Sequence, residues 1–216
     1  MKRIKNKFII SLSLLTAFIL WTVAICFVDV QAIGPCGSFV GFAKINNFVH
    51  NLTGVHFGLY NITDWLGLVP IGIAFYFAVL GLVQWIKRRK LVKVDRSLLT
   101  LGGFYIVVMA VYIFFETVVI NYRPVLIGGY LEVSYPSSTT LLVMCVMPTA
   151  MMQLGTRIKN KIFRRCVLLI IALFITFMVI GRLVSGVHWV TDIIGGALIS
   201  SALVMMYAYV CNNGYS

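Results

Sequence analysis

The chain has 216 residues, of which 61% are apolar and 11% are charged, and its mean hydropathy is +0.98. Soluble domains carry about 25% charged residues, so the composition excludes a soluble globular protein and predicts an integral membrane protein. The formal net charge of +12 would suit a nucleic-acid binder, but the basic residues cluster between apolar runs, which is typical of membrane topology signals. We therefore expect the lipid bilayer, and no nucleic acid, as a partner.

The five cysteines show no paired spacing, and most of them lie in or beside apolar runs. This pattern predicts neither a disulfide framework nor a metal site, and we expect no cofactor.

The first predicted span is an apolar run from about residue 8 to 28, which follows Lys2, Arg3, Lys5 and Lys7. A basic start before an apolar run also fits a secretory signal peptide. The run is too long for the apolar region of such a peptide, so we interpret it as an uncleaved transmembrane helix.

The stretch from Asp29 to Trp65 mixes aromatic, glycine and polar residues. It is too polar to cross the bilayer and too apolar to be a free linker. We expect one or two short interfacial helices in this first outer loop, covering an active site. His50 and His56 lie here without a metal-binding neighbour, and we interpret them as surface or packing residues.

Five more apolar runs complete the predicted bundle, each long enough to cross a bilayer as a helix. The fold class is therefore all-α, a polytopic membrane protein with six transmembrane helices, and residues 1–216 form a single membrane-embedded domain. The further predicted spans are about 66–86, 97–120, 137–154, 166–181 and 193–211.

The basic residues orient the predicted spans. Of the eighteen Lys and Arg, four precede the first span, six lie in residues 87–96 and five in residues 157–165. These three segments share one side of a six-span protein, and positive residues stay cytoplasmic, so both termini should be cytoplasmic. The remaining three, Lys44, Arg123 and Arg182, fall on the outer side.

The segment before the last span combines a cation, an imidazole and a carboxylate beside apolar runs. Ionisable groups at such positions mark functional sites. His188 and Asp192 are four residues apart, so on a helix they share a face, and the carboxylate can orient the ring for nucleophilic attack. The guanidinium group of Arg182 can donate two parallel hydrogen bonds to the oxygens of a phosphate.

A second polar group precedes the fourth span, on the same predicted side. Arg123 comes before Pro124, and Pro136 is followed by Ser137, Ser138 and Thr139. Two arginines, these hydroxyls and the N–H groups of a helix start would together bind a phosphate. The hydroxyls also fit a plain helix cap.

At these residues the sequence resembles the type 2 phosphatidic acid phosphatase superfamily, also called lipid phosphate phosphatases. The third motif of that family is Ser-Arg, five residues, His, three residues, Asp. It is present at Arg182, His188 and Asp192, with Gly181 in place of the serine.

The other two motifs of the family are only partly present. The first, a lysine and six residues before Arg-Pro, keeps Arg123-Pro124 but has Glu116 at the lysine position. The second, Pro-Ser-Gly-His, keeps Pro136-Ser137 and then reads Ser138-Thr139. Thr139 replaces the histidine that, in the family, protonates the leaving group.

The resemblance implies a lipid phosphatase in the cell membrane, with its active site facing outside. It implies metal-independent hydrolysis of a lipid phosphate or diphosphate through a phosphohistidine on His188. Asp192 would orient the ring of His188. Arg123, Arg182 and Ser137 would hold the phosphate. A diphosphate has the better leaving group, so the replaced histidine favours the hypothesis of a diphosphate substrate.

The role of Glu116 and the class of function both remain open. Glu116 either holds Arg123 from two helical turns below or, if burial raises its pKa, serves as the missing acid. The protein could be a lipid phosphotransferase that uses the same His188 and Asp192, or a catalytically inactive relative that binds lipid phosphates. A transporter is less favoured, because charged residues do not recur along the middle of the spans. The sequence leaves the oligomeric state unknown.

Overall fold

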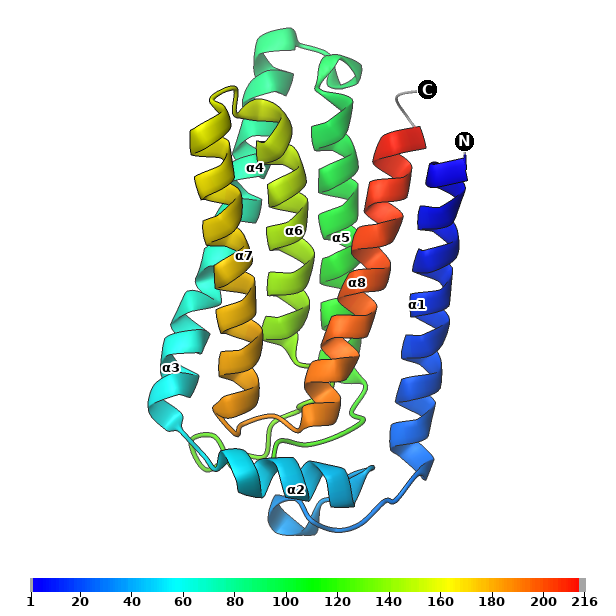
Figure 1. The fold of residues 1–216 in the computed structure, drawn as a ribbon, viewed down its shortest axis with the longest axis vertical. Helices are drawn as coiled ribbons and strands as arrows, with labels where there is room; N and C mark the ends of the chain where they lie inside the picture. Colours follow the sequence, from blue (N-terminus) through cyan, green and yellow to red (C-terminus); the bar gives the residue numbers. More distant parts are fainter. Residues whose placement is uncertain (1, 214–216) are drawn as a thin grey trace.

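The computed structural model describes residues 2–213, and their side chains from Lys5 onward. Six helices of this part of the chain are long and apolar enough to cross a membrane (Figure 1), which confirms the predicted all-α fold. Apart from two short 3-10 turns, η1 (Pro35–Gly37) and η2 (Leu91–Lys93), the elements are α1 (Lys2–Phe27), α2 (Ala43–Thr53), α3 (Phe57–Leu66), α4 (Leu68–Arg88), α5 (Arg96–Thr117), α6 (Ser138–Arg157), α7 (Lys161–Val184) and α8 (Val190–Asn213).

The predicted interfacial region contains two helices of different kinds. Helix α2 lies across one end of the bundle (Figure 1). Helix α3 is separated from α4 only by Gly67, and the two together form one candidate span, Phe57–Arg88. The second span therefore begins earlier than the predicted residue 66. Pro70 explains the break, because proline lacks an amide hydrogen and its ring crowds the carbonyl four residues earlier, which is that of Leu66.

Helix α7 is longer than its apolar run at both ends. It begins at Lys161 rather than 166, because the side chain of Asn160 accepts hydrogen bonds from the amides of Ile162 and Phe163, both 3.0 Å long, and caps the helix. It ends at Val184 rather than 181, so Arg182 lies in its last turn.

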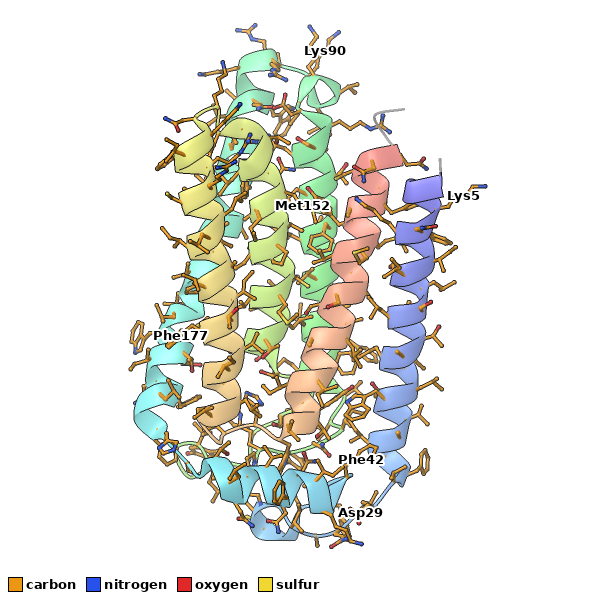
Figure 2. The ribbon with its side chains drawn as sticks, in the orientation of Figure 1. Lys5, Asp29, Phe42, Lys90, Met152 and Phe177 are labelled. Carbon is orange, nitrogen blue, oxygen red and sulfur yellow. The ribbon has the colours of Figure 1, made fainter. Side chains whose placement is uncertain are left out.

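The two ends of the bundle differ in charge and in cover. Both termini, the α4–α5 connection and the α6–α7 connection lie at one end, and α2 lies at the other (Figure 1). Figure 2 places Lys5 and Lys90 at the first end, and Asp29 and Phe42 at the second. The basic segments described in the structure are therefore gathered at the end away from α2.

Helices α6 and α8 form the buried centre of the bundle, and α1 packs along α8. The segment before α6 is anchored here through Tyr135, which is buried and whose hydroxyl lies 2.7 Å from the hydroxyl of Thr22 on α1. Gly195 on α8 makes room for this ring, since a Cβ there would lie 2.4 Å from it. This packing fixes the segment before α6 against α1 and α8.

Candidate active site

The connection between α5 and α6 contains a hairpin with a two-residue turn. Ile127 and Tyr130 exchange both backbone hydrogen bonds, at 3.1 and 3.0 Å, around Gly128-Gly129. Both glycines have positive φ, 58° and 85°, which is the geometry of a type I′ turn and favours glycine. Further along, the amide of Arg123 donates to the carbonyl of Glu132 at 3.0 Å. The hairpin thereby sets the position of Arg123.

The loop between α7 and α8, which carries His188, is docked on the connection between α2 and α3. The amide of His56 donates to the carbonyl of Ser185 at 2.9 Å. Gly186 has a φ of +69°, and a Cβ on it would lie 1.9 Å from the carbonyl oxygen of Gly54. Only glycine allows the two backbones to approach this closely.

Helix α2 holds the other side of this loop. The side chain of Asn46, which is fully buried, donates to the hydroxyl of Thr191 at 3.0 Å and accepts from the amide of Thr191 at 3.3 Å. The ring of His50 packs on that of Trp189, with centroids 5.4 Å apart. His188 is therefore fixed by contacts on both sides, and His50 is a packing residue, as predicted.

His188 and Asp192 are buried, and Ser134 lies between them. The Oγ of Ser134 is 3.0 Å from His188 Nδ1 and 2.5 Å from Asp192 Oδ2, whereas His188 Nδ1 and Asp192 Oδ2 are 3.9 Å apart. Asp192 also accepts from the backbone amide of Trp189 at 2.9 Å and from the amide group of Asn121 at 3.4 Å.

Arg123 and Arg182 reach the site from different elements, and both are buried. Their guanidinium carbons lie 5.8 and 5.0 Å from the centre of the Tyr60 ring on α3, so the two cations flank one aromatic residue. Arg123 Nε is 3.1 Å from Glu132 Oε2, and Arg182 Nη1 is 3.5 Å from Asp64 Oδ1. Both carboxylates are exposed, with 41% and 57% of the side chain accessible, so neither neutralises its arginine within the buried site.

Several buried nitrogen atoms of the site have no hydrogen-bond partner among the described residues. They include Nε and Nη1 of Arg123, Nε of Arg182 and Nε2 of His188. The contact of Arg123 Nε with Glu132 is an ion pair and not a hydrogen bond. Buried guanidinium donors are costly unless they are paired, so the arrangement of the two arginines suits an anion that offers several oxygen acceptors.

The predicted hydroxyl cluster is only partly joined to these groups. Ser137 is buried, and its amide donates to the main-chain carbonyl of Asp192 at 3.1 Å. Ser138 lines a small cavity beside Glu116, and Thr139 is largely buried at the start of α6. The hydrogen bonds of residues 2–213 connect neither Ser138 nor Thr139 to His188 or the arginines.

Glu116 does not lie on a common helix with Arg123. The prediction assumed a continuous helix through both residues, but α5 ends at Thr117, so their seven-residue spacing does not place them on one face. The ion pair of Arg123 in the described structure is with Glu132 instead. Glu116 faces the small cavity together with Tyr112.

Sequence reasoning missed several residues of the site. They contact His188, Asp192 or the arginines from other segments, namely Tyr60, Asn121 and Ser134. The Gly128-Gly129 pair is the local signal of the hairpin that positions two of them. Asp64 and Glu132 are acidic residues of the predicted outer side, where the two arginines require counter-charges, and each of them pairs with one arginine. Within residues 2–213, no group of three or more His, Cys, Asp or Glu side chains is placed to hold a metal.

Comparison with known proteins gave two matches. The family model of the PAP2 superfamily matches residues 122–215. The crystal structure of a transmembrane PAP2-type phosphatidylglycerolphosphate phosphatase from Bacillus subtilis has a similar fold, with a TM-score of 0.56, 18% identity, and coverage of 94% of this chain and 96% of that one. A search of curated proteins gave no significant match.

The environment of His188 predicts a ring that stays neutral in mild acid. Burial, together with the positive charges of Arg123 and Arg182, holds the pKa of His188 well below its ordinary value of 6.5. A lowered pKa means that the ring is still unprotonated as the pH falls through 6.5 and gains its proton only in stronger acid. Nitrogen NMR of histidine-labelled protein, with His188→Asn to assign the signal among the three histidines, should show a neutral ring at pH 6. Half-protonation at pH 6.5 or above would contradict this.

Proposed function

This chain belongs to the PAP2 superfamily, and from this premise we propose that it is a membrane phosphatase that removes phosphate from a lipid phosphate or diphosphate. The observation that carries the proposal is the set of buried, unpartnered nitrogen atoms on Arg123, Arg182 and His188. Two cations beside a neutral imidazole make a site for an anion that the imidazole can attack.

The proposed reaction begins with attack of His188 Nε2 on the phosphorus atom. The bond between phosphorus and the lipid oxygen breaks, and that oxygen leaves with the electron pair. Arg123 and Arg182 stabilise the charge on the remaining phosphoryl oxygens, as cationic clamps do in phosphoryl transfer. Water then attacks the phosphohistidine, releases phosphate and restores His188. Over the cycle, water supplies a hydroxyl to phosphorus and a proton to the lipid product.

The charge distribution supports an orientation for this chemistry. The basic connections lie at the end of the bundle opposite α2 (Figure 1), whereas His188 lies in the α7–α8 connection at the α2 end. Positive connections remain cytoplasmic, so we place both termini inside the cell and the site at the outer surface of the membrane.

Thr139 bears on the choice of substrate and on whether the protein turns it over. It stands where the family has the histidine that protonates the leaving group, and threonine cannot do this at neutral pH. Loss of that group would suit a catalytically inactive lipid-phosphate binder. It would equally suit a diphosphate substrate, because a phosphate monoester leaves far more readily than an alkoxide and needs less acid assistance. Transfer of the phosphoryl group from His188 to an alcohol instead of water would make the protein a phosphotransferase.

We expect purified protein to release phosphate from lipid substrates, and His188→Ala to lower the rate by at least about 10³-fold, because the attacking nitrogen is gone. His56→Ala is the matched control, since His56 is exposed and its backbone contact with Ser185 survives the change. Product analysis with added alcohol separates hydrolysis from transfer. Absence of turnover on every lipid phosphate and diphosphate would leave the binding role instead.

Diphosphates should be the better substrates. General-acid assistance is normally worth about 10²- to 10⁴-fold, so we expect turnover of a polyprenyl or diacylglycerol diphosphate to exceed that of the matching monophosphate by at least about 10-fold. The monophosphates should include phosphatidylglycerolphosphate, which appears in the name of the structural neighbour. Faster release from the monophosphates would defeat the predicted preference.

The proposed orientation can be tested with the native Cys36, which is exposed in the connection between α1 and α2. In intact cells, a membrane-impermeant maleimide should label a variant that keeps only Cys36. The matched control is Lys90→Cys in a cysteine-free background, because Lys90 lies at the opposite end of the bundle (Figure 2). Labelling of the Lys90→Cys protein alone would reverse the orientation.

A further inference from the structure

Ser134 lies in the gap between the proposed nucleophile and its carboxylate. We propose that Ser134 is a positioning residue that connects His188 to Asp192 and sets the tautomer of the imidazole ring. The proposal rests on the proposed function and adds a residue that lies outside the local spacing of the His-Asp motif.

The distances show that the carboxylate and the imidazole do not interact directly. Nitrogen and oxygen atoms in a hydrogen bond are about 2.7–3.2 Å apart, and the 3.9 Å between His188 Nδ1 and Asp192 Oδ2 exceeds this range. The two contacts of the Ser134 hydroxyl, 3.0 Å to the ring and 2.5 Å to the carboxylate, are both within reach. The hydroxyl is therefore the link between them.

Asp192 is not free to close the gap itself. Its Oδ2 also accepts from the amide of Trp189 at 2.9 Å, and its Oδ1 accepts from Asn121 at 3.4 Å. Its own carbonyl is held by the amide of Ser137 at 3.1 Å. Movement toward His188 would break these bonds in a fully buried place, where unpaired polar groups are costly.

Counting hydrogen atoms assigns the tautomer. An ionised carboxylate only accepts hydrogen bonds, and a serine hydroxyl has one hydrogen to donate. Ser134 gives that hydrogen to Asp192, so it must accept at His188, and Nδ1 of the ring must carry the proton. Nε2 is then the nitrogen with the free electron pair, and it is the ring nitrogen that has no partner in the described structure.

The same arrangement serves the reaction. When Nε2 bonds to phosphorus, the ring becomes a cation and keeps its proton on Nδ1. Ser134 accepts from this N–H while it donates to Asp192, so the negative charge of the carboxylate acts on the ring through the hydroxyl. No proton has to leave the ring during attack, and none has to return when water breaks the bond between phosphorus and nitrogen.

The fold holds Ser134 in this position. Its backbone amide donates to the carbonyl of Asn121 at 2.9 Å, at the base of the hairpin, and the residue is 2% exposed. The next residue, Tyr135, is anchored to Thr22 on α1. The hydroxyl is thus placed by the backbone on both sides and does not depend on its own rotamer alone.

The first experiment is the kinetics of Ser134→Ala on the lipid substrate that the wild type turns over fastest. Loss of an orienting partner typically costs about 10- to 100-fold in activity. We expect kcat to fall by about this factor while KM changes less than about twofold, since the arginines are untouched. Ser200→Ala is the control, because Ser200 is also buried but donates to the backbone of α6 and α8 and not to His188 or Asp192, and its kcat should stay at the wild-type value. Wild-type kcat in Ser134→Ala, or a change confined to KM and thermal stability, would overturn the proposal.

A second measurement is independent of enzymatic activity. Nitrogen NMR of histidine-labelled protein without substrate should show His188 as the Nδ1–H tautomer in the wild type, and as a mixture of tautomers in Ser134→Ala. An Nε2–H tautomer in the wild type would overturn the proposal. If the tautomer is as expected but no lipid phosphate is turned over, the proposed function fails and the role of Ser134 in setting the ring stands.

Discussion

The electrostatic cost of holding Arg123 and Arg182 beside one tyrosine ring, buried at the end of a membrane bundle, governs the arrangement of this site. Their carboxylate neighbours, Glu132 and Asp64, are exposed, and several guanidinium nitrogen atoms have no hydrogen-bond partner in the described structure. Such an arrangement persists only if the surrounding structure enforces it. An oxyanion would relieve the repulsion that these two exposed carboxylates offset only in part.

Part of the enforcing structure comes from outside the region that matches the family. Residues 122–215 carry both arginines, His188 and Asp192, but Tyr60 lies against both guanidinium groups from α3. Helix α2 fixes the start of α8 through Asn46 and Thr191. Helices α2 and α3 therefore support the segments that carry Arg123, Arg182 and His188, and both parts of the chain are needed to define the site.

What the sequence predicted depended on whether the information was local. Six apolar runs predict six helices because each span is decided by its own composition, and the basic connections fall at one end as predicted. The gap between His188 and Asp192 is different. It is filled by Ser134, which is 54 residues from the histidine, and no local spacing encodes that contact. Glu116 shows the converse error, because a regular spacing was extended to Arg123 across the end of α5.

The glycine at position 186 shows how strictly the backbone governs this chemistry. Because its missing Cβ would fall 1.9 Å from the oxygen of Gly54, a single added methyl group would push apart the two loops that meet there. The imidazole two residues later would be displaced although every reactive group was still present. A mutational scan would therefore score this position as if it were part of the catalytic apparatus, when its contribution is to the path of the backbone alone.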